Sequence, residues 1–167
     1  MPAFETLVAL TLGLTLAATC GLRAFLPLAL VSALGAGGLL ELPDALTWMA
    51  SPAAVLVFWT ATVAELVADK VPLVDHAFDA VATVLRPAAG AVAGGALLGG
   101  ADPMVATVFG LAGGTVVAGA THFGKAGIRL GSSATTVGAG NPVLSVGEDL
   151  IALGVGGAVL LGASALL

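Results

Sequence analysis

Residues 88–100 read AAGAVAGGALLGG, an unbroken apolar run in which glycine or alanine stands at most positions. Such residues let membrane helices approach closely, because packing rather than the hydrophobic effect drives helix association in lipid. The 167-residue chain shares this character: hydrophobic residues make up 59% and charged residues 9%. A soluble domain has about 25% charged residues, so this chain has too little polar surface to cover one. We predict an all-α, polytopic membrane protein with a single integral membrane domain, residues 1–167.

The apolar runs predict about six transmembrane helices arranged as three hairpins. A β-barrel is disfavoured because its strands would alternate in polarity. A membrane helix needs about 20 apolar residues. The expected spans are 5–22, 24–40, 52–69, 72–100, 103–124 and 142–166. Pro27 and Pro87 predict helices that are kinked or broken. The predicted loops are 41–52 and 130–141.

The placement of charge predicts an orientation. With six spans, Arg23, Lys70, Lys125 and Arg129 fall on one side of the membrane. The acids at positions 5, 41, 44 and 102 fall on the other side. The positive-inside rule makes the first side cytoplasmic, so both termini are expected to face outward.

Two of the hairpins resemble each other, which raises an internal repeat with halves 52–100 and 103–167. Aligning Pro72 with Pro142 sets PLVDHAFDAVA against PVLSVGEDLIA and matches Asp79 with Asp149. Proline is favoured in a first helical turn, where its missing N–H has no partner. Chance similarity between two apolar helices that start with proline is the alternative.

Several classes of function are disfavoured. A net charge of −5 and the absence of a basic cluster argue against nucleic acid. Motifs of hydrolases and P-loop proteins are absent, so we expect no enzyme and no cofactor. Asp75, His76 and Asp79 have a spacing that could bind a divalent cation. On a helix, however, His76 points about 100° away from Asp75, so a metal site stays an open question.

Four segments resemble a bacterial family of small membrane proteins known as domain of unknown function 4126. They are CGLRAFLPL (20–28), ELVADKVPLVDHAFDAVATVLRPAAGA (65–91), THFGKAGIR (121–129) and NPVLSVGEDLIAL (141–153). The resemblance spans nearly the whole chain and implies a multi-pass protein of the bacterial cytoplasmic (inner) membrane. It implies no activity.

Helical spacing groups the charges into ladders. Residues four apart share a helix face. Glu65 and Asp69 form an acidic ladder, and Lys125 and Arg129 form a basic one. We predict that these four residues, with Lys70, form a structural ion network in which segment 65–79 meets segment 121–129.

A second group lies deeper along the helices. Asp79 is about 10 Å and Arg86 about 21 Å along the helix from Pro72, which puts Arg86 near the middle of a bilayer. Glu148 and Asp149 lie as deep below Pro142 as Asp79 below Pro72. Ionisable residues at such depth indicate a functional site. With Asp75, these residues form the predicted substrate or ion pathway: Asp75, Asp79, Arg86, Glu148 and Asp149. Three of these carboxylates, at positions 79, 148 and 149, would surround Arg86 and leave excess negative charge there. The alternative is a purely structural Arg86–Asp149 or Arg86–Asp79 pair.

Two functions fit this pattern. One is a small transporter or channel for an ion or small polar solute. The alternative is a non-catalytic membrane scaffold or partner subunit whose charges are only structural. A water-filled passage to the deep charges would favour the first, and a dry, fully paired cluster the second. A chain this small offers little internal volume, so a homodimer in the lipid bilayer is expected in either case.

Overall fold

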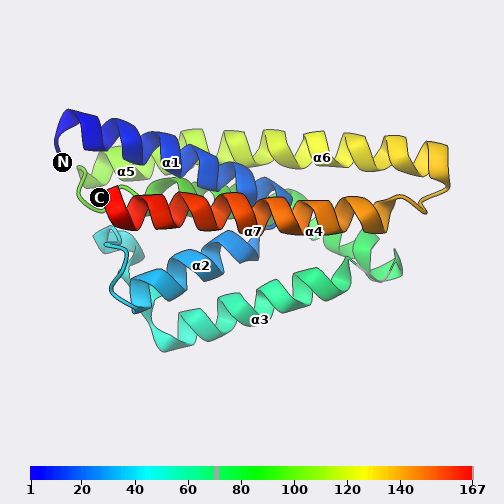
Figure 1. The fold of residues 1–167 in the computed structure, drawn as a ribbon, viewed down its shortest axis with the longest axis horizontal. Coiled ribbons are helices and arrows are strands. Elements are labelled where there is room, and N and C mark those ends of the chain that lie inside the picture. Colours follow the sequence, from blue (N-terminus) through cyan, green and yellow to red (C-terminus); the bar gives the residue numbers. More distant parts are fainter. Residues whose placement is uncertain (70–71, 167) are drawn as a thin grey trace.

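The fold is helical throughout the part of the chain that the computed structural model describes. It describes the backbone of residues 1–69 and 72–166, and the side chains of residues 1–69 and 81–166. No strand occurs within those backbone ranges, which confirms the all-α prediction. The α-helices are α1 (Ala3–Leu22), α2 (Phe25–Ala36), α3 (Pro52–Ala68), α4 (Pro72–Ala96), α5 (Pro103–Phe109), α6 (Thr115–Thr136) and α7 (Asn141–Leu166). The 3₁₀ helix η1 (Asp44–Ala50) precedes α3, and the π-helical turn η2 (Gly110–Gly114) joins α5 to α6. Figure 1 labels the α-helices.

Among the residues whose side chains are described, three helical segments are long and apolar enough to cross a membrane by themselves. They are α1, the continuous segment Pro103–Thr136 and α7. The pair η1 and α3 passes the same test together but is bent by 73°. The remaining apolar segments that could be compared are α2, which has 12 residues, and Val81–Ala96, the part of the 25-residue α4 whose side chains are described. Helices therefore occupy all six predicted ranges, whereas the prediction of six spans in three hairpins is not confirmed.

Two local predictions are corrected: the helix is not broken at Pro87, and the second predicted loop is mostly helical. Helix α4 runs without a break through Pro87, whose ring packs near Gly119 of α6. Membrane helices tolerate proline where neighbouring helices cover the freed backbone groups. The predicted loop 130–141 is mostly helix, because α6 continues to Thr136. Only a short turn follows, in which Val137 (φ 55°) and Gly138 (φ 84°) adopt the left-handed conformation that ends many helices.

Capping residues determine where helices α3 and α5 begin. Ser51 precedes Pro52, and its hydroxyl accepts a hydrogen bond from the Ala54 amide. Asp102 precedes Pro103, and its carboxylate accepts from the amides of Met104 and Val105. Both pairs follow the same rule: the cap satisfies free amides in the first turn, and proline occupies the position whose amide needs no partner.

Glycine allows α1, α4 and the η2–α6 segment to pack backbone to backbone. A Cβ added at Gly13 would lie 2.5 Å from the carbonyl oxygen of Gly94, and one at Gly114 would lie 2.2 Å from that of Gly90. No real side chain fits at such distances, so only glycine permits these contacts. The run 88–100 thus provides the close helix contacts that its composition predicted.

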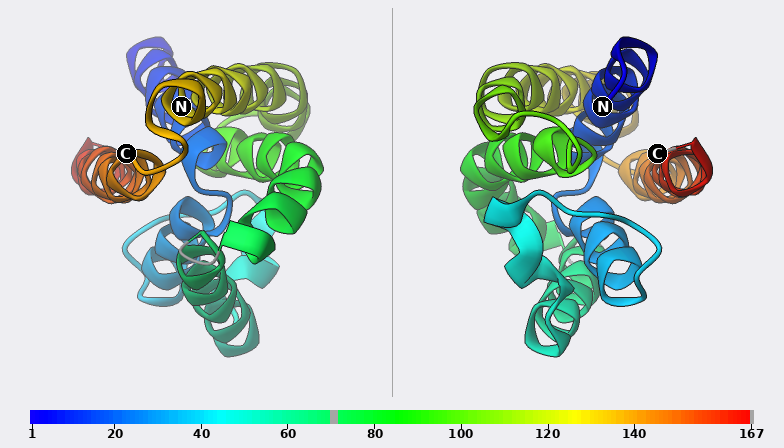
Figure 2. Two further views of the ribbon diagram at one scale, coloured as in Figure 1. Left: turned by 90° about the vertical axis from the view of Figure 1, so that its right-hand side faces the viewer. Right: turned by 90° about the vertical axis from the view of Figure 1, so that its left-hand side faces the viewer.

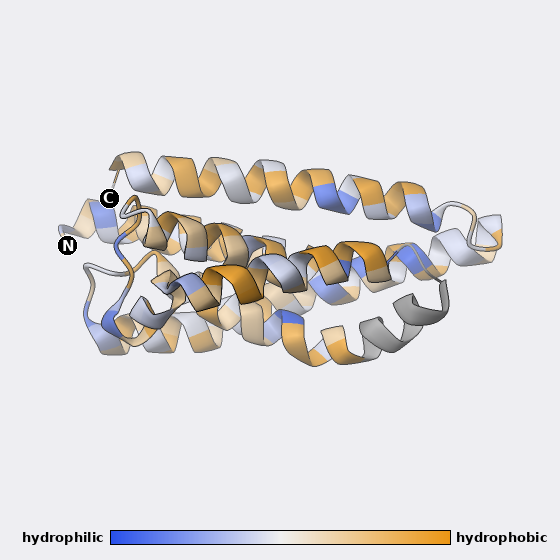
Figure 3. Cartoon of the chain, turned by 90° about the horizontal axis from the view of Figure 1, so that it is seen from below, coloured by the Kyte–Doolittle hydropathy of each residue, from blue (hydrophilic) through white to orange (hydrophobic). Residues whose placement is uncertain are grey.

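The other helices surround this glycine-packed core. Helix α1 lies between α6 and α7, and α2 packs against α3 and α7, as the end views in Figure 2 show. Both chain termini lie at one end of the molecule (Figure 1). Large apolar side chains cover the outside, among them Leu56, Val57, Ile128, Leu130, Leu150 and Leu161. Figure 3 shows the same apolar character along most of the ribbon, which is the surface that lipid requires.

Candidate functional site

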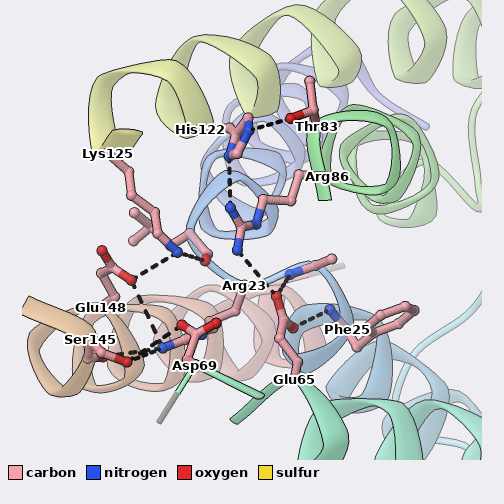
Figure 4. Close-up of polar contacts among 12 residues, drawn as sticks. Arg23, Phe25, Glu65, Asp69, Thr83, Arg86, His122, Lys125, Ser145 and Glu148 are labelled. Carbon is pink, nitrogen blue, oxygen red and sulfur yellow. Dashed lines mark hydrogen bonds and ion pairs between the residues drawn. The ribbon is translucent and has the colours of Figure 1, made fainter. Parts of the chain in front are cut away.

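Eight charged side chains from every major part of the fold meet in one buried group, which we call the ion network. Its cations are Arg23, Arg86, Lys125 and Arg129, and its anions are Glu65, Asp69, Glu148 and Asp149. Figure 4 shows most of them with their polar partners. Arg23 and Arg86 are fully buried, and the Asp149 side chain, at 23% exposure, is the most open member. The ion network is therefore least covered at Asp149 of α7.

Arg23 holds the α1–α2 turn to α3 and α7. Its guanidinium bonds to the Asp69 carboxylate, lies 2.6 Å from Asp149 and donates to the Ser145 hydroxyl at 2.8 Å. Burial alone would lower the pKa of Arg23, but Asp69, Asp149 and Glu65 outweigh burial and raise it. The guanidinium therefore stays charged at every physiological pH.

Helix α6 supplies the next two cations from its inner face. Arg129 donates to Asp69 at 3.1 Å and to Glu148 at 3.0 Å. Lys125 lies 2.8 Å from Glu148 and also donates to the Leu22 carbonyl. The acidic ladder of α3 and the basic ladder of α6 therefore meet, as their spacing predicted.

Glu65 acts across helices as a cap. Its two carboxylate oxygens accept hydrogen bonds from the Ala24 amide at 2.9 Å and the Phe25 amide at 3.1 Å, at the start of α2. A carboxylate is favoured there because the free amides and the dipole of a helix N-terminus attract negative charge. The same carboxylate lies 3.7 Å from the Arg86 guanidinium. One buried acid thus links α2, α3 and α4.

His122 extends the ion network between α4 and α6. Arg86 Nη1 lies 2.7 Å from His122 Nδ1, and Thr83 Oγ1 lies 3.2 Å from His122 Nε2. Because a guanidinium only donates, Nδ1 must accept, which leaves the proton of a neutral imidazole on Nε2 facing Thr83. The position a Gly21 Cβ would take lies 3.1 Å from the His122 amide. The Arg86–His122 pair is therefore level with the last turn of α1. The depth expected for Arg86, near the middle of a bilayer, stays a prediction.

The charges of the described ion network balance. Four cations face four anions, so its formal charge is zero when all are ionised. The prediction of excess negative charge around one arginine includes Asp79, which lies outside the described side chains, and so it stays a prediction. It left out Arg23, Lys125 and Arg129, which contact the same carboxylates.

The two predicted groups form one network where the structure describes them. Arg86 pairs with Glu65, and Asp149 pairs with Arg23, so the first expected pair, Arg86–Asp149, does not form between these described side chains. The alternative pair, Arg86–Asp79, involves a side chain that is not described. Lys70, Asp75, His76 and Asp79 lie outside the described side chains. Among the described residues, no three His, Cys, Asp or Glu side chains gather as they would to hold a metal ion.

Arg23 is the member of the ion network that the sequence analysis did not assign to a site. It served there only to orient the chain. The sequence showed only a single arginine between two apolar helices, which fits a solvent-exposed turn as well as a buried ion pair. Depth in the fold, which the sequence did not provide, separates these two cases.

Asp69 gives the protein a testable response to acid. Burial alone would raise the pKa of Asp69, but Arg23, Lys125 and Arg129 outweigh it and lower this pKa below its ordinary 3.8. A lowered pKa stabilises the fold above the unfolded-state value, and this contribution is lost as pH falls through the folded-state value. In detergent, the free energy of unfolding should stay level from pH 7 to about 4.5 and fall below about pH 4.

Chemical unfolding of Asp69→Asn across the same pH range checks this expectation. The variant should be less stable at neutral pH and should lose less stability on acidification. An equal acid-induced loss in both proteins would contradict the assignment to Asp69.

Comparison with known proteins gives the chain a family. Residues 10–162 match the family described as Domain of unknown function (DUF4126). The chain belongs to this family. The match confirms the resemblance seen in the sequence and covers nearly the whole of this DUF4126 protein. No curated protein and no solved structure matches the chain.

Proposed function

We propose that this DUF4126 protein moves a small ion or polar solute across a membrane, and that the ion network is the gate at one face. The observation that supports the proposal is the convergence of the α1–α2 turn and helices α3, α4, α6 and α7 on a buried network of ion pairs, in which the described cations and anions are equal in number. To conduct, the protein would have to separate some of these ion pairs. The arrangement described here is then the closed form.

The cost of burying the charges of the ion network favours a role for them beyond stabilising the fold. A buried ion pair is weak support for a fold, because desolvation of the two charges offsets much of their attraction. The fold has another means of holding α1, α4 and α6 together, since glycine brings their backbones into contact at Gly13, Gly94, Gly90 and Gly114. Charges kept in a membrane protein at such a cost are a functional hypothesis by default.

The scaffold alternative has one observation in its favour. The network is largely buried, and its described charges compensate each other, which is what a structural lock between helices requires. By the criterion of solvent access, such a cluster fits a partner subunit of a larger assembly. Transport and scaffold differ in flux, so flux is the property to measure.

Asp149→Asn is the variant that separates the two functions. Asp149 is the most exposed member of the network, so an ion that enters from the α7 side would meet it early. The change keeps the shape of the side chain and leaves Arg23 paired with Asp69. In proteoliposomes tested with a panel of ions and small solutes, we expect its flux to fall about tenfold or more, at a nearly unchanged melting temperature.

Glu41→Gln is the matched control, because Glu41 is an exposed acid outside the network. Its flux should equal that of the wild-type protein. Flux that is absent for every solute in a folded wild-type protein would favour the scaffold. Flux that is present but unchanged in Asp149→Asn would contradict the assignment of the gate to the ion network.

The membrane setting completes the proposal. We place the protein in the bacterial cytoplasmic membrane as a multi-pass homodimer, with the basic side facing the cytoplasm and both termini facing outward. The positive-inside rule supports this orientation. The lipid-suited outer surface supports the location.

A further inference from the structure

The end of the molecule remote from the ion network contains a separate cavity of about 350 Å³. Its walls come from η1, from the end of α4 and from the α5–η2 segment. Apolar side chains such as Leu46, Val92 and Leu111 line it, together with the small residues Ala91, Gly95 and Ala106. Its volume lies in the range of pockets that bind small molecules, about 300–1,000 Å³. The lining fits a hydrocarbon better than the polar solute proposed for the gate.

The surroundings of the cavity have the features of a membrane–water interface. Its wall helix α5 starts at a capped loop end, and exposed Met104 and Val108 make the outer face of this helix apolar. On the other wall, Trp48 of η1 is 54% exposed and its ring contacts Phe58. Exposed tryptophan is typical of the level where membrane meets water. A lipid acyl chain can therefore reach the cavity from the side.

The mouth of the cavity is acidic. Asp44 lines it, and Asp102 stands between the lining residues Ala101 and Pro103. Among the described side chains, the lysine and arginine residues all belong to the ion network. The Met1 ammonium, which donates to the Gly100 carbonyl, is the positive group at this end.

We propose that this cavity binds one acyl chain of a phospholipid whose headgroup carries an ammonium group. The apolar walls hold the chain, and the carboxylates at the mouth attract the ammonium while they repel a headgroup with net negative charge. Phosphatidylethanolamine has such a headgroup, and phosphatidylglycerol does not. The site is independent of the gate, since it shares no residue with the ion network.

Competition between these two lipids tests the proposal. The full-length protein, purified in mild detergent, is incubated with equal amounts of phosphatidylethanolamine and phosphatidylglycerol that carry identical acyl chains. Native mass spectrometry then measures how much of each lipid stays bound. We expect a preference of about fivefold for phosphatidylethanolamine. Asp44→Asn should reduce the preference and leave total retention nearly unchanged.

A filled cavity is the second arm of the experiment. Thr107 is an exposed lining residue on α5, so Thr107→Phe can occupy the space without disturbing buried packing. It should reduce retention of both lipids severalfold, whereas Val108→Phe, next to it and outside the lining, should not. Equal retention of the two lipids by the wild-type protein would overturn the proposal. Undiminished lipid retention by Thr107→Phe would overturn it as well. If Thr107→Phe instead changed the oligomeric state of the protein without loss of lipid, the cavity would be assigned to contact with a second copy of the chain.

Discussion

Gly114→Leu should prevent stable folding of the helical core. A Cβ at Gly114 would lie 2.2 Å from the carbonyl oxygen of Gly90 and 3.2 Å from the Cα of Ala91. Both obstacles are backbone atoms, so no rotation of a side chain relieves the contact, and α4 would have to move away from η2 and α6. Overpacking usually costs about 1–3 kcal/mol, and we expect a loss above about 3 kcal/mol here because the backbone itself is displaced.

Gly127→Leu is the matched control on α6. Gly127 is exposed, and nothing lies within 4 Å of the position its Cβ would take. Because leucine is a better helix former than glycine, the control should be neutral or more stable by up to about 1 kcal/mol. Unfolding in detergent and the yield of folded protein measure both variants. Equal losses in the two variants would mean that close backbone packing at Gly114 does not hold the core.

Arg86→Met should cause the second large loss of stability. Arg86 is fully buried, lies 3.7 Å from Glu65 and bonds to His122. Methionine has a similar length and no charge, so it fills much of the space but leaves the Glu65 carboxylate without this cation. Removal of one partner of a buried pair costs about 3–5 kcal/mol, because the other charge stays buried.

Val84→Met gives the control on the same helix, since Val84 is 72% exposed. It should change the free energy of unfolding by less than about 0.5 kcal/mol. Thermal and denaturant unfolding in detergent compare the two variants. A neutral Arg86→Met would show that Glu65 does not depend on this cation.

The sequence predicted the helices well and their ends less well. Apolar runs showed where helices lie, because lipid imposes the same requirement on every span. The end of α6 was missed because Gly131, Ser132 and Thr136 are weak helix formers. In the structure, the hydroxyls of Thr135 and Thr136 bond to carbonyls four residues back, at Gly131 and Ser132, which satisfies these polar groups within the helix.

The candidate site was predictable to the extent that spacing along one helix defines it. Glu65 and Asp69 share a face of α3, and Lys125 and Arg129 share a face of α6, so both ladders could be found in the sequence. The partners of Arg86 depend on how α3 and α4 pack, which one-dimensional spacing does not contain. The capping of α2 by Glu65 joins residues that are 40 or more positions apart.

A double-mutant cycle on Glu65 and Arg86 tests the central claim most directly, namely that the buried charges compensate each other as one network. It compares the free energies of unfolding of the wild-type protein, Glu65→Gln, Arg86→Met and the double variant. Glutamine keeps an oxygen for the α2 amides and removes the charge. We expect the double variant to lose about 1–3 kcal/mol less unfolding free energy than the two single variants lose together, because neither charge is then left buried without its partner. Losses that add within about 0.5 kcal/mol would contradict it.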